Sequence, residues 1–586
     1  MAVPCAVCRD DDGWRVLRQP TQEEKKGARR GGDRLSKLED RALGHILSFL
    51  PAKEAARAAL LSPRWRHVFA AVHTVSLDEP EGTNTDDDDN RGHDSPSDSH
   101  RRPPPFPTAV SAAIIGRQRR RGVAPLRALR VAMERYRGHD TTTVDQWVSY
   151  AAQHAAPEGL DLDLRIWCRR MLCNRPYALR EENNQAGPEP DKYYPPLYRS
   201  RPSPTVDVGS QSDDEDEDER DNHHDQRLLC DPPEYIVPRL LFSCAELRSL
   251  CLSSCRLSPP RTVTLPSLVT LLLSHVPDGS TGVKRLVAGC PRLTDLTLEM
   301  CEAVTTLTVL GGARLRRLAI RCCHNLAAVA VDSSELRTFE YRGAVPDSAS
   351  FLTMHGDAGS IAYCKVDLCG TEATSEVEIT NLRHLLHQFV NAKHLHLESD
   401  RLGYGFDKDV MTARFASFSG LRHLEMRGCL PNSDTGIIDA MRRVLEHAPN
   451  LEALSLAFHP QKSTEKHDAW GVYHEPDYSL EEELDAAHHL GYNRNLVLAT
   501  PTAMIPCLRS KVREINLVHY HGGTAQRTLA KFLLCNAPAI DKLWCEFAEG
   551  PMWMQVQLMR RDQGLVDQQV GQHPLRLNRC EVPSRR

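Results

Sequence analysis

Residues 293–298 read Leu-Thr-Asp-Leu-Thr-Leu, and this Leu-x-x-Leu-x-Leu pattern recurs along the chain. When other apolar residues are tolerated, five clear copies follow one another: Leu247/Leu250/Leu252, Leu268/Leu271/Leu273, Leu293/Leu296/Leu298, Leu315/Leu318/Ile320 and Leu336/Phe339/Tyr341. Their starts lie 21, 25, 22 and 21 residues apart. So regular a spacing indicates one structural unit that is repeated, with each triplet in the same place.

The spacing falls within the range of about 20–29 residues that leucine-rich repeats use. In such a unit the triplet lies on a short strand and points inward, and neighbouring units must stack because one unit cannot bury its own apolar face. Weaker copies extend the array: Leu126/Leu129/Val131, Ile361/Cys364/Val366, Ala392/Leu395/Leu397, Leu421/Leu424/Met426, Leu451/Leu454/Leu456 and Val512/Ile515/Leu517. We therefore predict an α/β solenoid, a horseshoe of parallel strands, with chance leucine periodicity as the alternative.

Residues just outside the triplets should mark the surfaces of this solenoid. Cys255, Cys301, Cys322 and Cys429 follow the predicted strands, where this fold commonly buries Cys or Asn. Counting from the triplets places charged residues on the concave face: Asp295, Glu299, Arg317, Arg321, Glu340, Arg342, His396, Glu398, Glu425 and Arg427. Their alternating sign suits a polar protein partner. Any single one is more often a solvated residue than a binding hot spot.

A different pattern occupies residues 33–72 and predicts three short helices. Leu43, Ile46, Leu47 and Leu50 follow helical spacing, and Pro51 should end that helix. Ser62 is suited to cap a later helix that begins at Pro63, in which Trp65, Val68, Phe69 and Val72 repeat the spacing. Because about 40 residues cannot bury all these side chains alone, part of the apolar stripe should face a partner.

Three blocks of this segment resemble the F-box of plant F-box proteins: Asp33-Arg-Leu-Ser-Lys-Leu38, Ile46-Leu-Ser-Phe-Leu-Pro-Ala-Lys53 and Leu61-Ser-Pro-Arg-Trp-Arg66. The resemblance implies docking on the Skp adaptor subunit of a cullin-based ubiquitin ligase. By position, the docking residues or their supports would be Leu35, Leu38, Ile46, Leu50, Pro51 and Trp65. The chain departs from the family pattern at Glu39, Pro63 and Phe69, and the first of these could weaken the contact.

The C-terminal region carries a second resemblance. Residues 507–517 followed by 529–538 are similar to the FBD-type ending of plant F-box and leucine-rich-repeat proteins. We expect a strand and then a helix that cap the open end of the solenoid.

Composition and charge divide the chain further. The like-charged runs Asp86–Asp89 and Asp213–Glu219 lie in stretches too polar to form a core. The predicted organisation is a disordered tail, an F-box, a disordered acidic and proline-rich insertion, the first solenoid repeats, a second disordered insertion, the main repeats, an FBD-like cap and a disordered tail, at residues 1–32, 33–72, 80–105, 106–180, 181–235, 236–500, 501–562 and 563–586.

The same composition argues against several classes of function. The net charge is only −5 over 586 residues, so nucleic-acid binding is not expected, although Arg117 and Arg119–Arg121 could form a basic patch. The 19 cysteines are scattered, and we expect reduced thiols. Phosphate-loop, serine-elbow and zinc-helix motifs are absent from the sequence. We expect no enzyme, no cofactor, no metal and no membrane contact, and a location in the cytoplasm, the nucleus or both.

These features combine into one functional hypothesis. The resemblance implies a substrate-recognition adaptor of a Skp–cullin–F-box ubiquitin ligase, in which the F-box binds the Skp-family adaptor and the repeat surface binds an unknown substrate protein. The alternative is a leucine-rich-repeat scaffold with a non-functional F-box.

Overall fold

The protein is described here from a computed structural model. It describes residues 7–10, 13–16, 37–58, 65–79, 105–118, 124–134, 136–166, 234–310, 314–356, 361–369, 375–403, 417–431, 436–459, 504–520 and 522–547. The chain forms two compact units, one made of residues 1–75 and 112–124, the other of residues 76–111 and 125–586. No helix in the described ranges is both long and apolar enough to cross a membrane.

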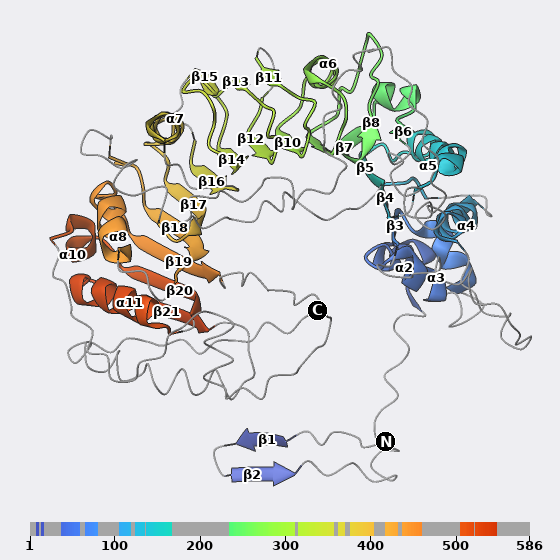
Figure 1. Ribbon diagram of the computed structural model, residues 1–586. Coiled ribbons are helices and arrows are strands. Elements are labelled where there is room, and N and C mark those ends of the chain that lie inside the picture. The colour runs from blue at the N-terminus through green and yellow to red at the C-terminus, as the bar shows by residue number, and fades with distance from the viewer. Residues whose placement is uncertain are drawn as a thin grey trace, which may run out of the picture. The chain divides into compact units, whose positions relative to one another are not determined.

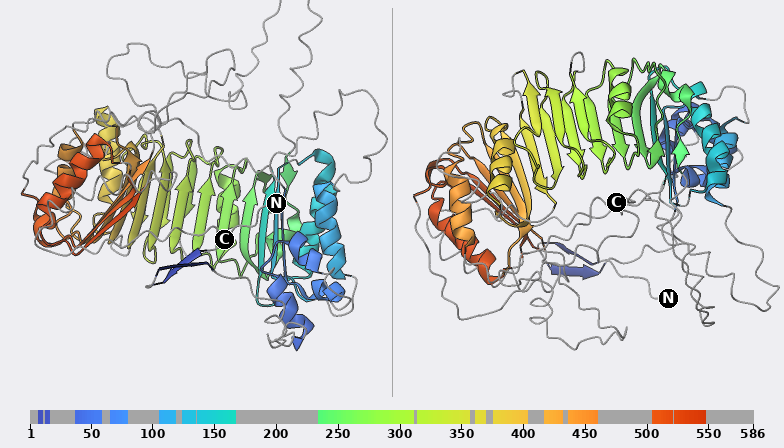
Figure 2. Two further views of the ribbon diagram at one scale, coloured as in Figure 1. Left: turned by 90° about the horizontal axis from the view of Figure 1, so that it is seen from below. Right: turned by 45° about the horizontal axis from the view of Figure 1, so that its top comes forward.

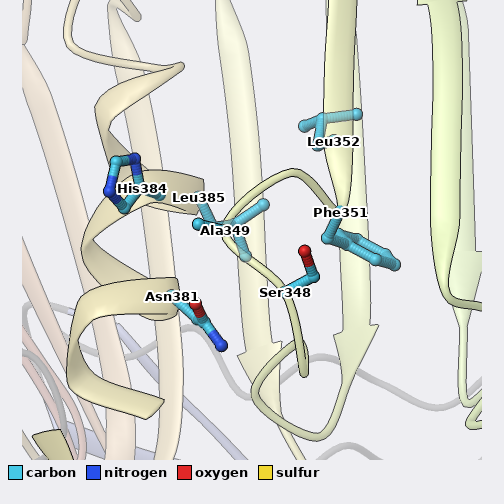
Figure 3. A pocket seen from close by; sticks show the side chains of 7 residues that line it. All are labelled: Ser348, Ala349, Phe351, Leu352, Asn381, His384 and Leu385. Atoms are coloured by element: carbon cyan, nitrogen blue, oxygen red, sulfur yellow. The ribbon is translucent and has the colours of Figure 1, made fainter. Parts of the chain in front are cut away.

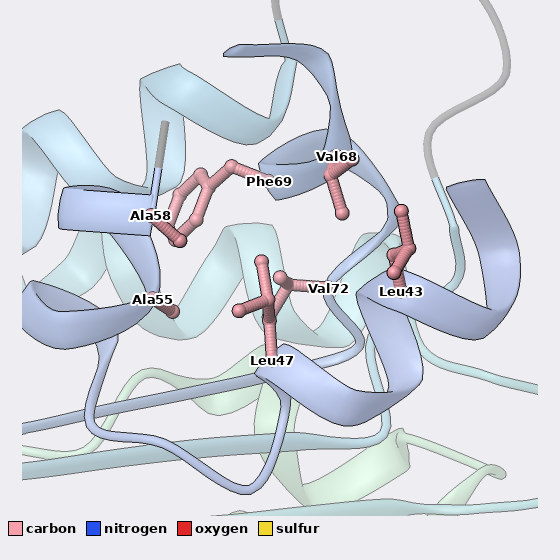
Figure 4. Packing of buried hydrophobic residues seen from close by; sticks show 7 residues of the cluster. All are labelled: Leu43, Leu47, Ala55, Ala58, Val68, Phe69 and Val72. Atoms are coloured by element: carbon pink, nitrogen blue, oxygen red, sulfur yellow. The ribbon is translucent and has the colours of Figure 1, made fainter. Parts of the chain in front are cut away.

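The first unit contains the three predicted short helices. They are α2 (Asp40–Leu47), α3 (Ala52–Arg57) and the 3-10 helix η3 (Trp65–Ala71). Figure 4 shows their side chains converging on one small core, formed by Leu43, Leu47, Ala55, Ala58, Val68, Phe69 and Val72. A close approach of α2 to η3 supports this core, because a Cβ added at Gly44 would lie 2.5 Å from the Ala71 carbonyl oxygen.

Two details of this unit differ from the sequence expectation. The residues predicted to share one helical stripe are divided, since Leu43 and Leu47 are buried whereas Ile46 and Leu50 are exposed. In addition, α2 ends at Leu47, and Pro51 is the N-cap residue of α3 rather than the end of the first helix. Proline excludes the helical conformation from the residue before it, so the chain leaves the helix earlier. The predicted cap at Ser62 and Pro63 lies outside the described residues.

The second unit is built on a sheet of 14 strands whose pairs from β4 to β21 are parallel. In spatial order the strands are β3 (Thr74–Asp78), β4 (Ala128–Met133), β5 (Leu160–Ile166), β7 (Leu247–Ser253), β9 (Thr270–Ser274), β10 (Asp295–Glu299), β12 (Arg317–Arg321), β14 (Thr338–Gly343), β16 (Tyr363–Leu368), β17 (His394–Arg401), β18 (His423–Cys429), β19 (Ala453–His459), β20 (Glu514–Tyr520) and β21 (Lys542–Phe547). Sequential order is thus spatial order, as stacking of one repeat on the next requires.

Helices and short strands form the outer layer of the curved sheet (Figures 1 and 2). The helices are η5 (Gly138–Asp140), α5 (Thr141–Gln153), η8 (Arg239–Ser243), α6 (Ser280–Ala288), α7 (Glu376–His387), α8 (Ile437–Glu446), α10 (Pro506–Ser510) and α11 (Thr524–Asn536). Helix α4 (Phe106–Gln118) is divided between the two units. The middle repeats use strands instead, and β11 (Thr306–Val309), β13 (Ala328–Asp332) and β15 (Leu352–His355) form a second parallel sheet. Strands β6 (Tyr235–Ile236) and β8 (Cys255–Arg256) form a further parallel pair.

Every apolar triplet predicted from the sequence lies in the core of this unit. No member of the eleven triplets is more than 7% exposed, including the weaker copies. The fold class predicted from the sequence is therefore confirmed. The pattern search missed three strands of the sheet: β3 before the first triplet, β5 in the long gap between the triplets that start at Leu126 and Leu247, and β21 after the last triplet.

A few of the described residues lie inside segments that were predicted to be disordered. The hairpin of β1 (Val7–Asp10) and β2 (Gly13–Val16) lies within the predicted disordered tail, where Asp12-Gly13 is a turn-favouring pair between alternating residues. Tyr235, assigned to the second insertion, is fully buried. Pro105 and Glu234, at the edges of the two predicted insertions, are described and exposed; the rest of the predicted disordered segments falls outside the described residues.

Candidate protein-docking surfaces

An exposed apolar group stands at the C-terminal end of α2 in the first unit. Ile46 is 43% exposed, Phe49 76% and Leu50 42%. Large apolar side chains clustered on a small unit mark a surface that binds another protein. The sequence analysis named Ile46 and Leu50 but missed Phe49, whose position in the turn after α2 breaks the helical spacing.

The turn that carries these residues is held from inside the unit. The buried Ser48 hydroxyl donates to the Gly44 carbonyl at 2.8 Å and accepts the His73 backbone N–H at 3.0 Å. The His45 and Phe49 rings meet edge to face at 5.0 Å between centroids. Ser48 therefore anchors the turn while its neighbours project outward.

The other predicted docking residues occupy different environments. Leu38 and Trp65 are partly buried and pack against the small core, so they support the exposed group. Pro51 is exposed next to it. Leu35 lies outside the described residues.

Arg117 corrects the hypothesis of a basic surface patch. Its side chain is fully buried, its Nε donates to the Val72 carbonyl at 2.8 Å and its Nη2 to the Ala124 carbonyl at 2.6 Å. The residue therefore satisfies backbone oxygens inside the first unit. A local charge count could not reveal this, because one partner oxygen, that of Val72, lies 45 positions away in the sequence. Arg119–Arg121 lie outside the described residues.

The second candidate surface is the concave face of the repeat unit, defined by the side chains between the buried positions of the strands. The strand register aligns the predicted residues: Asp295 pairs with Arg317, Glu299 with Arg321, and Arg321 with Arg342. His396 lies beside Glu425 and Glu398 beside Arg427 in the same way. All ten charged residues predicted for this face thus belong to adjacent strands of one sheet.

Most of these charges bind one another across strands. Arg321 Nη1 lies 2.6 Å from Glu299 Oε1 and its Nη2 lies 2.8 Å from Glu340 Oε2, while Arg317 Nη2 lies 2.8 Å from Glu340 Oε1. Burial alone would raise the pKa of Glu340, but Arg321 and Arg317 outweigh it and hold this pKa low. Arg342 pairs with the buried Asp367 at 3.5 Å.

A second charged group surrounds His396, which is 4% exposed. Its ring nitrogens each lie 3.4 Å from a carboxylate oxygen, Nε2 from Glu398 and Nδ1 from Glu425. Burial alone would lower the pKa of His396, but the two carboxylates outweigh it, so the net shift is upward.

The two carboxylates respond in the opposite direction. Burial alone would raise the pKa of Glu398, but His396 and Lys365 outweigh it and lower the pKa to about 2. His396, and also Arg427, lower the pKa of Glu425 to about 2 against the effect of burial. Both carboxyl groups are therefore ionised at neutral pH and paired with cationic side chains of the same face.

A hollow between α7 and the loop before β15 is a weaker candidate (Figure 3). Its lining residues are Ser348, Ala349, Phe351, Leu352, Asn381, His384 and Leu385. The Asn381 amide already donates to the Pro346 carbonyl at 3.0 Å. With that polar group satisfied, the hollow offers little to hold a small molecule.

Comparison with known proteins matches two segments of the chain to known domains. Residues 35–73 match the F-box domain model, and residues 233–479 match the model described as the LRR domain of At1g61320/AtMIF1. The chain carries an F-box followed by leucine-rich repeats. The exposed group Ile46, Phe49 and Leu50 lies within the F-box match, and the charged concave residues from Asp295 to Arg427 lie within the leucine-rich-repeat match.

Relatives in Arabidopsis thaliana share this F-box and leucine-rich-repeat architecture. The F-box/LRR-repeat protein At3g59200 is 49% identical over 47 residues, which are 8% of this chain and 9% of that protein. The F-box/LRR-repeat protein At4g14103 is 51% identical over 47 residues, 8% of this chain and 12% of that protein. The F-box/LRR-repeat protein At3g03360 is 23% identical over 475 residues, covering 79% of this chain and 76% of that protein.

The identity is thus high over short segments of 47 residues and low over the alignment of 475 residues. The FBD-type resemblance of the C-terminal region stays a prediction, since it lies beyond residue 479, where the leucine-rich-repeat match ends. In the described residues this region contains α10, β20, α11 and β21, so a strand and a helix occur as expected, and a further strand follows them.

Proposed function

We propose that this F-box and leucine-rich-repeat protein is a non-enzymatic substrate adaptor of a Skp–cullin–F-box ubiquitin ligase. The exposed group Ile46, Phe49 and Leu50 carries the proposal, because it places apolar side chains on the surface of a unit that matches the F-box. A Skp-family adaptor would bury this group. The predicted location in the cytoplasm or the nucleus accords with such a role.

The finer part of the proposal concerns the substrate, which would be a protein with a mixed-charge surface. The concave face supports this with half-exposed charges of both signs, among them Arg317, Glu425 and Arg427. A substrate could exchange its own charges for those of the internal ion pairs. Tethering through both surfaces would raise the effective concentration of substrate lysines near the ligase.

The test measures binding of a purified Skp-family adaptor to the full-length chain by calorimetry. The full chain is required because Arg117 completes the first unit from outside the F-box segment. Phe49→Ala should weaken binding by about 30-fold, the effect of losing a central hot spot of about 2 kcal/mol. Because Phe49 is 76% exposed, the variant should keep its fold.

A matched control separates docking from general loss of apolar surface. Val377 in α7 is 66% exposed and lies in the repeat unit, so Val377→Ala should leave adaptor affinity unchanged. If the natural chain does not bind the adaptor at micromolar concentration, the scaffold alternative replaces the adaptor proposal. The substitution of the usual F-box residue by Glu39 would then be tested first as the cause, because Glu39 is the N-cap residue of α2 and makes no side-chain capping hydrogen bond.

A second experiment addresses the substrate. In cells, cross-linking to the natural chain and to a double variant, Arg317→Ala with Arg427→Ala, would be compared by mass spectrometry. Proteins that bind through the concave face should be lost from the variant while the Skp-family adaptor is retained. Retention of every partner would argue against the concave face as the substrate surface.

A further inference from the structure

Two buried cysteines from different repeats meet beside a histidine. Cys322 follows β12 and Cys369 follows β16, and their Sγ atoms lie 3.9 Å apart although 47 positions separate them. His324 comes two residues after Cys322, and one donor atom from each of the three residues lies within 4.8 Å of the other two. Both cysteines are at most 1% exposed, and His324 is half-buried.

The intervening repeat makes this approach possible. Strand β14 lies between β12 and β16, and it ends at Gly343, which Ala344 follows. These are the two smallest residues. The buried Tyr341 of the same strand lies beside them, and its hydroxyl donates to the Ala344 carbonyl. The Cys369 backbone N–H donates to the Gly343 carbonyl at 3.0 Å, which fixes the third repeat against the second.

We propose that Cys322, His324 and Cys369 bind a zinc ion. Zinc prefers thiolate and imidazole ligands in a tetrahedral arrangement. Two sulfurs at about 2.3 Å from a tetrahedral ion lie about 3.8 Å apart, and the two thiols are already at 3.9 Å. The two thiols therefore need little movement to close on the ion.

Charge also favours this ion over others. Cysteine binds metals as thiolate and histidine as neutral imidazole. Two thiolates and one imidazole neutralise Zn²⁺, which suits a site where both cysteines are buried. A monovalent copper ion would leave a net negative charge there. His324 is half-buried, and we expect a water molecule to complete the tetrahedron.

A disulfide is the competing use of the same thiols. A disulfide needs the sulfurs at about 2.05 Å and gives His324 no role. A zinc ion uses all three residues and joins the loops after β12 and β16 across β14. It would therefore brace the middle of the sheet that carries the charged concave face.

Cobalt substitution tests the site in the full-length protein. The chain is purified under reducing conditions, stripped with a chelator and titrated with Co²⁺, followed by titration with Zn²⁺. Variants His324→Ala and Cys369→Ala are compared with a control, Cys290→Ala. Cys290 is a buried cysteine outside the cluster, and its thiol donates to a backbone carbonyl. Circular dichroism checks that each variant folds.

We expect about one Co²⁺ per chain, with a thiolate-to-cobalt charge-transfer band that Zn²⁺ abolishes. His324→Ala should weaken zinc affinity by at least about 100-fold, the upper end of the loss caused by removing even an outer partner. Cys290→Ala should bind as the natural chain does. Because His324→Ala removes a half-buried ring and keeps both thiols, it tests the site even if Cys369→Ala does not fold.

Three results would overturn the proposal. One is the absence of the charge-transfer band from the folded natural chain. Another is equal metal affinity in His324→Ala and the natural chain. The third is a Cys322–Cys369 disulfide, found by peptide mass mapping of a separate preparation purified without reductant and with free thiols blocked at lysis.

Discussion

Arg321 Nη2 lies 2.8 Å from Glu340 Oε2, and this ion pair joins two adjacent strands on the concave face. The same guanidinium also contacts Glu299 on β10, the strand on the opposite side of β12 from Glu340. One cation is therefore shared by two carboxylates. Both carboxylates are largely buried, with side chains 16% and 15% exposed. A partner that binds this face must therefore compete with contacts that already stabilise the sheet.

The first prediction follows from this arrangement. Arg321→Met should lower the free energy of unfolding by about 1–3 kcal/mol, because two half-buried carboxylates would lose their shared cation. Arg316→Met is the control, since Arg316 and Glu335 are 3.9 Å apart and exposed, and should change stability by less than about 0.5 kcal/mol. Urea unfolding of both variants measures the difference. Equal effects would mean that the paired carboxylates add no stability.

The second prediction concerns the buried arginine of the first unit. Arg117→Met should destabilise that unit by about 2–4 kcal/mol, because the carbonyls of Val72 and Ala124 would lose charged donors while buried. Limited proteolysis of the F-box segment should become faster. Arg127→Met, which removes an exposed arginine of the other unit, should leave the rate unchanged. An unchanged rate in Arg117→Met would contradict the structural role of this residue.

The third prediction tests the contact between α2 and η3 with two glycines of the same unit. Gly44→Ala should cost about 1–3 kcal/mol, because its Cβ would collide with the backbone of Ala71. Gly116→Ala should instead stabilise the unit by about 0.5–1 kcal/mol, because its Cβ would make only an ordinary contact with Phe69 at 3.5 Å and alanine favours the helix. Thermal unfolding of the two variants should shift in opposite directions. Shifts of the same sign would refute the close approach at Gly44.

The fourth prediction is a pH dependence set by the charged group around His396. The pKa of Glu398 is lowered from its usual 4.5 to about 2, so its stabilising effect is complete above pH 4.5 and is lost as the pH falls towards 2. The pKa of His396 is raised, so its effect is complete below its usual 6.5 and is lost as the pH rises through the raised value. Both contributions are therefore complete only between about pH 4.5 and 6.5.

Urea midpoints measured across this range test the prediction. The difference in midpoint between the natural chain and Glu398→Gln should be largest between pH 4.5 and 6.5 and shrink on both sides. The exposed Glu335 provides a control, and Glu335→Gln should show little difference at any pH. A constant difference for Glu398→Gln across the range would show that the carboxylate and the imidazole are not coupled.

Much of the fold could be predicted from sequence because its signals are local. A buried strand residue must be apolar wherever its repeat is, so even weak triplets such as Ile361/Cys364/Val366 could be recognised, and they are buried. The concave charges could be placed by counting, because side chains alternate along a strand. Phe49 was missed because it lies in a turn, where neither the spacing of a helix nor the alternation of a strand applies.

The amino-acid sequence by itself determined the F-box segment, the number and order of the repeats recognised and the face on which each strand residue lies. Only the tertiary structure decided which apolar residues of α2 stay exposed, that Arg117 is buried, and that Cys322 and Cys369 meet across Gly343. The periodicity of apolar residues indicates only on which face of its own strand or helix a residue lies. A contact between residues 47 positions apart depends instead on how successive repeats stack.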